Sequence, residues 1–293
     1  MKKKQTFILT IIMYISSYST MIYKGDIEGS KITLFMDYDK GVYVYDKYKI
    51  PIPLDITKDK KDLILKSENE IFTFQNYDEE ADKIQGKWKN RNKVLVVNLE
   101  KELDTIKLER DTMVEIPMFY STRDEYFWIK IRTGGWYATS EEILVYNKNN
   151  GKLLQTIDMR FGEWRTFIGV TSLAVDDYNF DEILDFSLFG SYFVGANTIS
   201  NYFLKNNNEY KLAPSYYETS LYFDKEEKKV YSENSTRAGY SRSVITFVVK
   251  ENEYLIPIKK FQVEISDDEI THREITSIID TNGEWIKVEE KIY

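Results

Sequence analysis

Residues 31–46, KITLFMDYDKGVYVYD, contain the clearest structural signal in this chain. Ile32, Leu34 and Met36 recur at every second position, which is the period that places side chains on one face of a β-strand. Residues 41–45 then predict the return strand of a hairpin, because valine and tyrosine fit half-buried pleated surfaces. The stretch therefore predicts antiparallel β structure near the start of the chain.

Further strand signals follow this hairpin at close spacing. Pro51 and Pro53 confine the first of them to an edge or an irregular crossing, because proline cannot donate to a β-ladder. Short strands separated by turn residues are typical of a small antiparallel sheet or barrel. We therefore expect a small antiparallel β domain over residues 26–100. The runs are residues 50–54, 63–65, 71–74, 84–88 and 94–97.

The second half of the chain is also rich in strand signals. Asn150-Gly151 lies between two of the apolar runs and supplies the positive φ of a hairpin turn. The close spacing favours a β-sandwich, with a propeller-like layer as the alternative, over parallel βαβ units. We expect an antiparallel β-sandwich-like domain over residues 110–293, so that the whole fold is all-β. The runs are residues 127–131, 142–146, 152–157, 219–223, 229–232, 243–249 and 254–263.

Residues 98–116 interrupt the strand pattern. Leu99, Leu103 and Ile106 fit one face of a short helix. The density of charged residues in the same segment fits a linker equally well. We expect the boundary between the two domains here.

The composition excludes several classes of protein. The 293 residues are 42% hydrophobic and 30% charged, an ordinary globular balance that excludes a multi-span membrane protein and a disordered chain. The absence of Cys excludes disulfides, thiol nucleophiles and Cys-bound zinc. A single His, His272, leaves little scope for histidine metal sites. Aromatic residues form 15% of the chain, which again favours β structure.

Residues 1–19 have the pattern of a secretory signal. Three lysines at positions 2–4 precede an apolar stretch at residues 7–15 that is too short to span a membrane as a helix. Ser17 and Ser19 are small residues at the two positions that a signal peptidase reads. We expect export to the periplasm or beyond, with no membrane span after cleavage. The alternative is an anchored N-terminal helix.

The charge of the chain restricts its partners. The formal net charge is −8 at pH 7, and removal of the three signal lysines would make it −11. An acidic surface repels nucleic acid and attracts basic proteins. We expect no binding to nucleic acid and, if there is a protein partner, a basic one.

Residues 177–185, DYNFDEILD, are the one segment whose pattern indicates chemistry. Asp177, Asn179, Asp181 and Asp185 place side-chain oxygens at loop positions 1, 3, 5 and 9, and the backbone carbonyl of Ile183 falls at position 7. This is the spacing of calcium ligands. Carboxylates this close repel by about 4 kcal/mol per pair at 4 Å and an effective dielectric of 20, which a bound cation would relieve.

The loop departs from an EF-hand at two positions. Leu188 stands at position 12 in place of a bidentate Glu, and Glu182 stands at position 6 in place of Gly. A left-handed conformation at a non-Gly residue costs about 1–2 kcal/mol. We therefore expect weak, structural Ca²⁺ binding, with a Kd of about 0.1–1 mM. The alternative is a solvated acidic turn.

The same loop carries a family resemblance. Residues 177–181 and the following Asp185-Phe186 resemble the central motif of a family of exported bacterial calcium-loop proteins, which normally has Gly in place of Glu182. The studied relative is an immunity protein that binds calcium and inhibits a lysozyme-like, peptidoglycan-cleaving effector of a type IV secretion system. Shorter matching segments are residues 195–197, 150–155, 221–224 and 229–232, and residues 41–45 through 86–88 resemble a small β domain often attached to such proteins.

The resemblance implies an exported, calcium-binding and non-catalytic protein that inhibits a peptidoglycan hydrolase. It gives no partner-binding residues, and we expect no catalytic residues. Two alternatives stay open. One is a cell-surface or periplasmic glycan-binding module that uses exposed aromatics such as Trp136 and Trp164. The other is a carboxylate-dependent glycan hydrolase, which needs two acids about 5–10 Å apart; pairs such as Asp124 and Glu125 are too frequent to single one out.

Overall fold

The computed structural model describes the chain from Thr20 onward with short gaps. The described residues are 20–107, 109, 111–133, 138–160, 165–166, 169–192, 197–216, 218–236, 241–251, 254–265 and 271–293. The expected signal segment, residues 1–19, lies outside them. Trp136 and Trp164 of the glycan-binding alternative also lie outside them.

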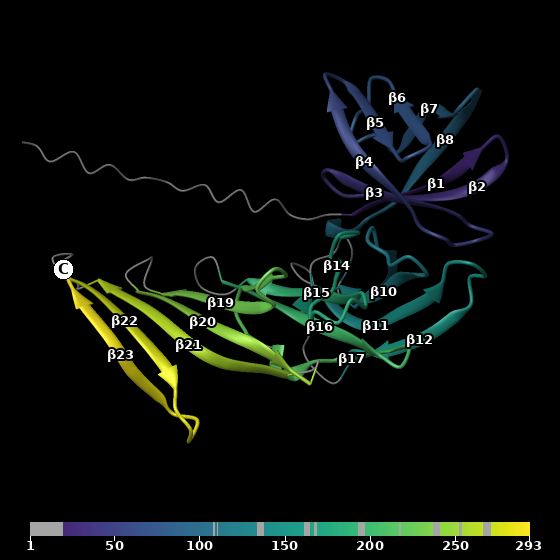
Figure 1. Cartoon of the computed structure of the whole chain (residues 1–293). Coiled ribbons are helices and arrows are strands. Elements are labelled where there is room, and N and C mark those ends of the chain that lie inside the picture. Colours follow the sequence, from purple (N-terminus) through teal and green to yellow (C-terminus); the bar gives the residue numbers. More distant parts are fainter. Residues whose placement is uncertain are drawn as a thin grey trace, which may run out of the picture.

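The first eight strands form a closed antiparallel barrel (Figure 1). Each strand pairs with the next one, and β1 pairs with β8 to close the ring. Aromatic side chains fill the interior, including Tyr23, Tyr43, Phe72 and Phe74, each with 1% exposure or less. The strands are β1 (Met21–Ile27), β2 (Ser30–Met36), β3 (Lys40–Tyr45), β4 (Ile52–Asp59), β5 (Asp62–Lys66), β6 (Glu70–Phe74), β7 (Lys83–Asn90) and β8 (Lys93–Asp104).

Gly25 lets the barrel close. It lies in β1 opposite Leu99 of β8, and a Cβ atom at this position would lie 1.8 Å from the backbone oxygen of Asn98. No real side chain tolerates such a distance, so any other residue would push β1 and β8 apart.

The helix considered for residues 98–116 is wrong in its first part. β8 continues to Asp104, where it pairs with Met21 of β1, and only Thr105–Lys107 form a short 3-10 turn, η1. Leu99 faces the barrel interior, whereas Leu103 packs against the core of the second half. A register shift in the β1–β8 pairing, between Ile22 and Tyr23, accompanies this change of face. Barrel closure thus overrides the helical spacing of these residues.

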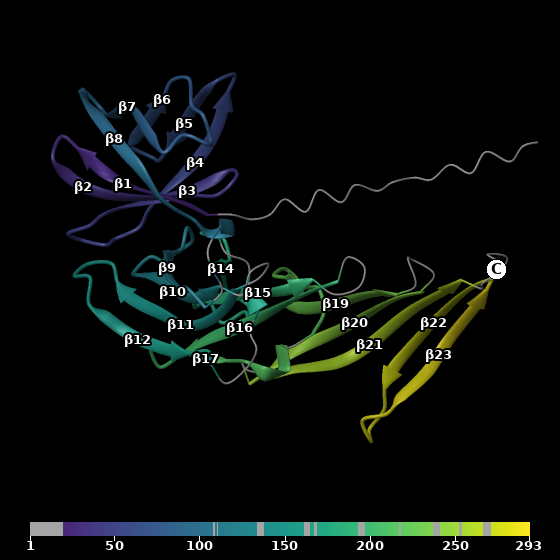
Figure 2. The same cartoon turned by 180° about the vertical axis from the view of Figure 1, so that it is seen from behind.

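The second half consists of three antiparallel sheets that follow one another (Figures 1 and 2). The first contains β9 (Met113–Pro117), β10 (Glu125–Thr133), β11 (Ala138–Asn147), β12 (Leu153–Asp158) and β13 (Arg165–Thr166). The second contains β14 (Leu173–Asp176), β15 (Asp185–Tyr192), β16 (Thr198–Asn206) and β17 (Glu209–Leu212). The third follows the short turn η2 (Pro214–Tyr216) and contains β18 (Leu221–Asp224), β19 (Lys229–Thr236), β20 (Ser241–Lys250), β21 (Tyr254–Ile265), β22 (His272–Ile279) and β23 (Trp285–Ile292).

The middle sheet, β14–β17, is buried on both faces. Phe186 and Phe203 belong to a core shared with β9–β12 and the outer wall of the barrel. Tyr202 and Leu204, next to Phe203 in β16, belong to a second core shared with β18–β21. This alternation is what a strand between two apolar layers requires. The expected all-β class with antiparallel sheets is confirmed; the second half, expected as β-sandwich-like, consists of three antiparallel sheets that follow one another.

The turn predicted at Asn150-Gly151 is also confirmed. Gly151 has a φ of +68° and its amide donates to the carbonyl of Asn147 at 2.9 Å. In the described part of the chain, no helix has the length and apolar character needed to cross a bilayer.

Candidate metal site

The acidic loop is the connection of the β14–β15 hairpin. The ladder ends at the pair Asp176 and Asp185, so residues 177–184 form the loop between them. Leu173 in β14 and Phe186 in β15 are fully buried and hold the two strands in the core. The packing of these two residues therefore fixes both ends of the loop.

Asp177 organises the first part of the loop. Its Oδ1 accepts from the amide of Asp181 at 3.1 Å, and its Oδ2 accepts from the amide of Glu182 at 2.9 Å. Asn179 Oδ1 also accepts from the Asp181 amide, at 3.3 Å. The side-chain oxygens of positions 1 and 3 thus converge on one backbone hydrogen.

Asp181 joins the same group of side chains. Its Oδ2 accepts from Nδ2 of Asn179 at 3.0 Å, and its Oδ1 accepts from the amide of Ile183 at 2.9 Å. Asn179 is 4% exposed, so this contact lies at the base of the loop. The side chain of Ile183, whose carbonyl is the predicted fifth ligand, is 46% exposed. Positions 1, 3 and 5 are therefore close together, held by amide hydrogens.

Asp185 is the innermost carboxylate. It is fully buried, and its two oxygens accept from the amides of Tyr178 at 3.0 Å and Lys205 at 2.8 Å. Burial raises the pKa of Asp185 to about 7, and the negative charges of Asp181 and Asp177 add to this rise. The neighbouring carboxylates thus destabilise the ionised form of Asp185. A cation bound in the loop would stabilise that ionised form.

In this structure the side-chain oxygens of the loop accept hydrogen bonds from amide groups of the loop; they are not arranged around one central point as the ligands of a bound metal ion are. Among the described residues, no group of three or more His, Cys, Asp or Glu side chains is gathered so as to hold a metal ion. The predicted ligand atoms still fit a hard cation, because all of them are oxygen atoms. Each carboxylate oxygen has more than one acceptor site, so the amide contacts leave room for a metal bond.

Lys205, which donates its amide hydrogen to Asp185, is itself held by Glu125, and Glu125 is held by Tyr210. The sequence analysis did not predict that these three residues belong to the site. The side chain of Lys205 pairs with Glu125 Oε1 at 2.8 Å, and the hydroxyl of Tyr210 donates to Glu125 Oε2 at 2.7 Å. Glu125 is 5% exposed and lies in β10 of the neighbouring sheet. Separations of 80 and 85 residues leave no local signal for these contacts.

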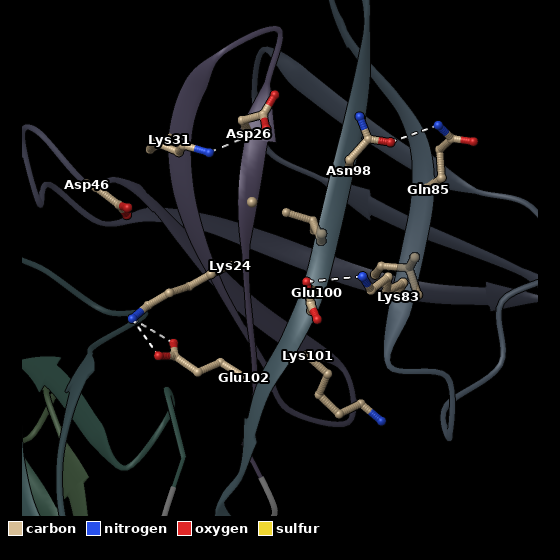
Figure 3. A pocket seen from close by; sticks show the side chains of 13 residues that line it. Lys24, Asp26, Lys31, Asp46, Lys83, Gln85, Asn98, Glu100, Lys101 and Glu102 are labelled. Atoms are coloured by element: carbon tan, nitrogen blue, oxygen red, sulfur yellow. Dashed lines mark hydrogen bonds and ion pairs between the residues drawn. The ribbon is translucent and has the colours of Figure 1, made fainter.

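Two hollows differ in their relation to this loop. One, of about 510 Å³, is bordered by Asn179, Asp181 and Ile183 of the loop and by Lys211 and Tyr254. The other, of about 790 Å³, lies on the barrel wall formed by β1, β7 and β8 (Figure 3). In Figure 3 most of its charged side chains form the ion pairs Lys24–Glu102, Lys31–Asp26 and Lys83–Glu100, while Asp46 and Lys101 are not paired with the residues drawn. Because most of its charges are compensated locally, we place the candidate site at the loop.

Comparisons with known proteins give a limited result. No family model and no curated protein matches the chain. Among solved structures, a Xanthomonas type IV secretion system related protein shares 12% identity and a TM-score of 0.37, with 92% of this chain and 99% of that chain covered. The fission yeast SREBP-SCAP binding domains share 8% identity and a TM-score of 0.26, with 90% and 74% covered. TolB from Acinetobacter baumannii shares 9% identity and a TM-score of 0.24, with 94% and 65% covered. Nothing about function is drawn from similarity at this level.

Glu182 provides a direct test of loop strain. Its φ is +69°, the left-handed region that favours glycine. We expect Glu182→Gly to raise the free energy of unfolding by about 1 kcal/mol, because glycine adopts this conformation without strain. Urea denaturation of both proteins in EDTA measures the effect without calcium. Glu28→Gly is the matched comparison: Glu28 also has a positive φ, of 46°, in the β1–β2 turn, so we expect a gain of the same sign there. Destabilisation by Glu182→Gly would contradict the strain argument.

Proposed function

We propose that this chain is an exported, non-catalytic protein that binds Ca²⁺ weakly through the β14–β15 loop and acts by binding another protein. The observation that carries the proposal is the convergence of Asp177, Asn179 and Asp181 oxygens beside the buried Asp185. These are the oxygen positions that the loop spacing predicts for a hard cation.

Ca²⁺ would be held by the side chains of Asp177, Asn179, Asp181 and Asp185 and by the carbonyl of Ile183. The ion supplies positive charge among carboxylates that otherwise repel one another. At 1 mM free calcium and the expected affinity, the gain in stability is about 0.4–1.4 kcal/mol. The ion would therefore fix the shape of the loop and add little to the stability of the whole protein.

The proposed partner is a basic cell-wall hydrolase, which this protein would inhibit. The net charge of −8 supports a basic partner, since complementary charge accelerates association. Ile183 and Leu184 at the C-terminal end of the loop are 46% and 40% exposed, as apolar contact residues need to be. The resemblance of residues 177–186 to the immunity-protein family supports the choice of a peptidoglycan-cleaving enzyme.

A lysis assay tests the inhibitory role. Hydrolases encoded beside this gene would be incubated with peptidoglycan and an excess of this protein, with 1 mM calcium or with EDTA. We expect protection that requires calcium and that falls at least about tenfold in potency in Leu184→Asp, because an added charge at this exposed end of the loop disturbs an apolar contact without changing a proposed ligand. Tyr222→Asp, a change at another exposed position, is the control. Equal lysis with and without the protein would contradict the proposed inhibition and leave calcium binding to be judged separately.

A further inference from the structure

The buried carboxylate of Asp37 joins the barrel to the second half of the chain. Asp37 follows β2 and is 7% exposed. Its Oδ2 accepts from the amide of Val170 at 2.8 Å, across 133 residues of sequence. Its Oδ1 accepts from the hydroxyl of Thr20 at 2.7 Å. One carboxylate thus holds the first described residue, the barrel and the second half together.

Thr20 is fixed as firmly as a core residue. Its exposure is 0%, its amide nitrogen donates to Thr105 Oγ1 at 2.9 Å, and its carbonyl accepts from the amide of Thr105 at 3.2 Å. These contacts continue the β1–β8 ladder by one residue beyond the Met21–Asp104 pair. Residue 20 is therefore a structural part of the barrel.

Asp37 interacts with neutral donors but not with a basic side chain in any of the described contacts. The hydrogen bonds come from the Thr20 hydroxyl and from the amides of Val170 and Thr171, and no ion pair of the described residues includes Asp37. Desolvation raises the pKa of this carboxyl to about 7. A buried carboxylate of this kind gains strongly from a nearby positive charge.

We propose that export processing between Ser19 and Thr20 creates this charge, and that the new α-ammonium group of Thr20 is the counter-ion of Asp37. The inference rests on the export that the proposed function includes. Hydrolysis of the Ser19–Thr20 bond by an export endopeptidase consumes one water: the C–N bond breaks, the carbonyl carbon of Ser19 gains the water oxygen and leaves as a carboxylate, and the nitrogen of Thr20 becomes an ammonium. That nitrogen lies three covalent bonds from the hydroxyl that already contacts Asp37, so it is within about 6 Å of the carboxylate.

The ammonium keeps the contacts that the amide makes and adds donors. One hydrogen can remain on Thr105 Oγ1, and the others are available to Asp37. Processing therefore stabilises the ionised form of Asp37, the carboxylate that accepts the hydrogen bond from Val170 of the second half. In the uncut chain the same nitrogen is an uncharged amide, so the pairing forms only after the leader is removed.

Four proteins test the pairing. They begin either at Thr20 or at Ser19, and each carries either Asp37 or the substitution Asp37→Asn. Asparagine is chosen because its side-chain oxygen can accept from the amide of Val170 and its side-chain nitrogen can donate to the Thr20 hydroxyl. In urea unfolding at pH 7, we expect the extra Ser19 to raise the unfolding equilibrium constant by about ten- to a hundredfold in the Asp37 background. In the Asp37→Asn background we expect a change below about threefold. An equal change in both backgrounds overturns the proposal.

Two further measurements keep the proposal testable if an Asp37→Asn variant does not fold. The exported protein should begin at Thr20 by mass spectrometry, and a different first residue overturns the inference. In a nitrogen-15 NMR titration of the Thr20 form, the α-amino group should have a pKa above its usual range of about 7.7–8.0, and an unshifted value overturns the pairing. Calcium calorimetry should be the same for the Thr20 and Ser19 forms, so failure of the pairing is distinguishable from failure of the proposed calcium function.

Discussion

Replacing Glu125 with alanine is expected to lower the free energy of unfolding by about 3–5 kcal/mol. The change would leave the ammonium of Lys205, whose side chain is 18% exposed, without its carboxylate partner. It would also remove the acceptor of the Tyr210 hydroxyl. Both losses fall between the first two sheets of the second half, and a cost of this size is a large part of the stability of an ordinary domain.

A double substitution separates the cost of the unpaired charge from that of lost packing. We expect Glu125→Ala/Lys205→Met to be more stable than Glu125→Ala alone, because the charge that would be stranded has been removed. Urea denaturation of the two single variants and the double variant measures the coupling. Additive effects would show that the ion pair is worth nothing at this position. Glu115→Ala is a control, since the side chain of Glu115 is 47% exposed and its pairing with Lys130 is at the surface.

The second large effect is expected from Phe186→Ala, at about 3–5 kcal/mol of lost stability. Phe186 is fully buried directly after Asp185. Its ring centroid lies 4.7 Å from that of Phe203, 4.9 Å from that of Tyr210 and 5.1 Å from that of Phe127. Alanine would leave a cavity among these rings, which the surrounding sheets can fill only in part.

Thermal and urea unfolding of Phe186→Ala against Tyr222→Ala measure this effect. Tyr222 is 65% exposed, so its truncation removes a ring of similar size without opening a cavity. A loss below about 1 kcal/mol in Phe186→Ala would show that the middle sheet is not the shared core of its neighbours.

Local sequence patterns were sufficient for the strands that alternate clearly. The period-two positions Ile32, Leu34 and Met36 lie in β2 with their side chains in the barrel, and residues 41–45 lie in β3. Asn150-Gly151 was predicted correctly because only a few residues adopt positive φ without strain. These features depend on neighbours in the sequence.

The parts that the sequence did not predict depend on contacts between distant residues. β23 alternates Ile286 and Val288 with charged residues, but all eight of its residues are exposed, so its pairing with β22 rather than burial of an apolar face holds it as a strand. Leu99 and Leu103 have helical spacing, yet pairing with β1 keeps them in β8. In the candidate site the acidic loop was found from its spacing, whereas Glu125 and Lys205, which hold Asp185 through β16, were not.

Calcium titration by isothermal calorimetry tests the central claim most directly. The proteins are the wild type, Asp177→Asn, Asp181→Asn and the control Asp224→Asn, whose Oδ1 accepts the amides of Glu226 and Glu227 in a different hairpin turn. We expect one site with a Kd of about 0.1–1 mM in the wild type and in Asp224→Asn, and at least about tenfold weaker binding in the two loop variants. No calcium heat in either the wild type or Glu182→Gly, in which the loop strain is relieved, would contradict the account.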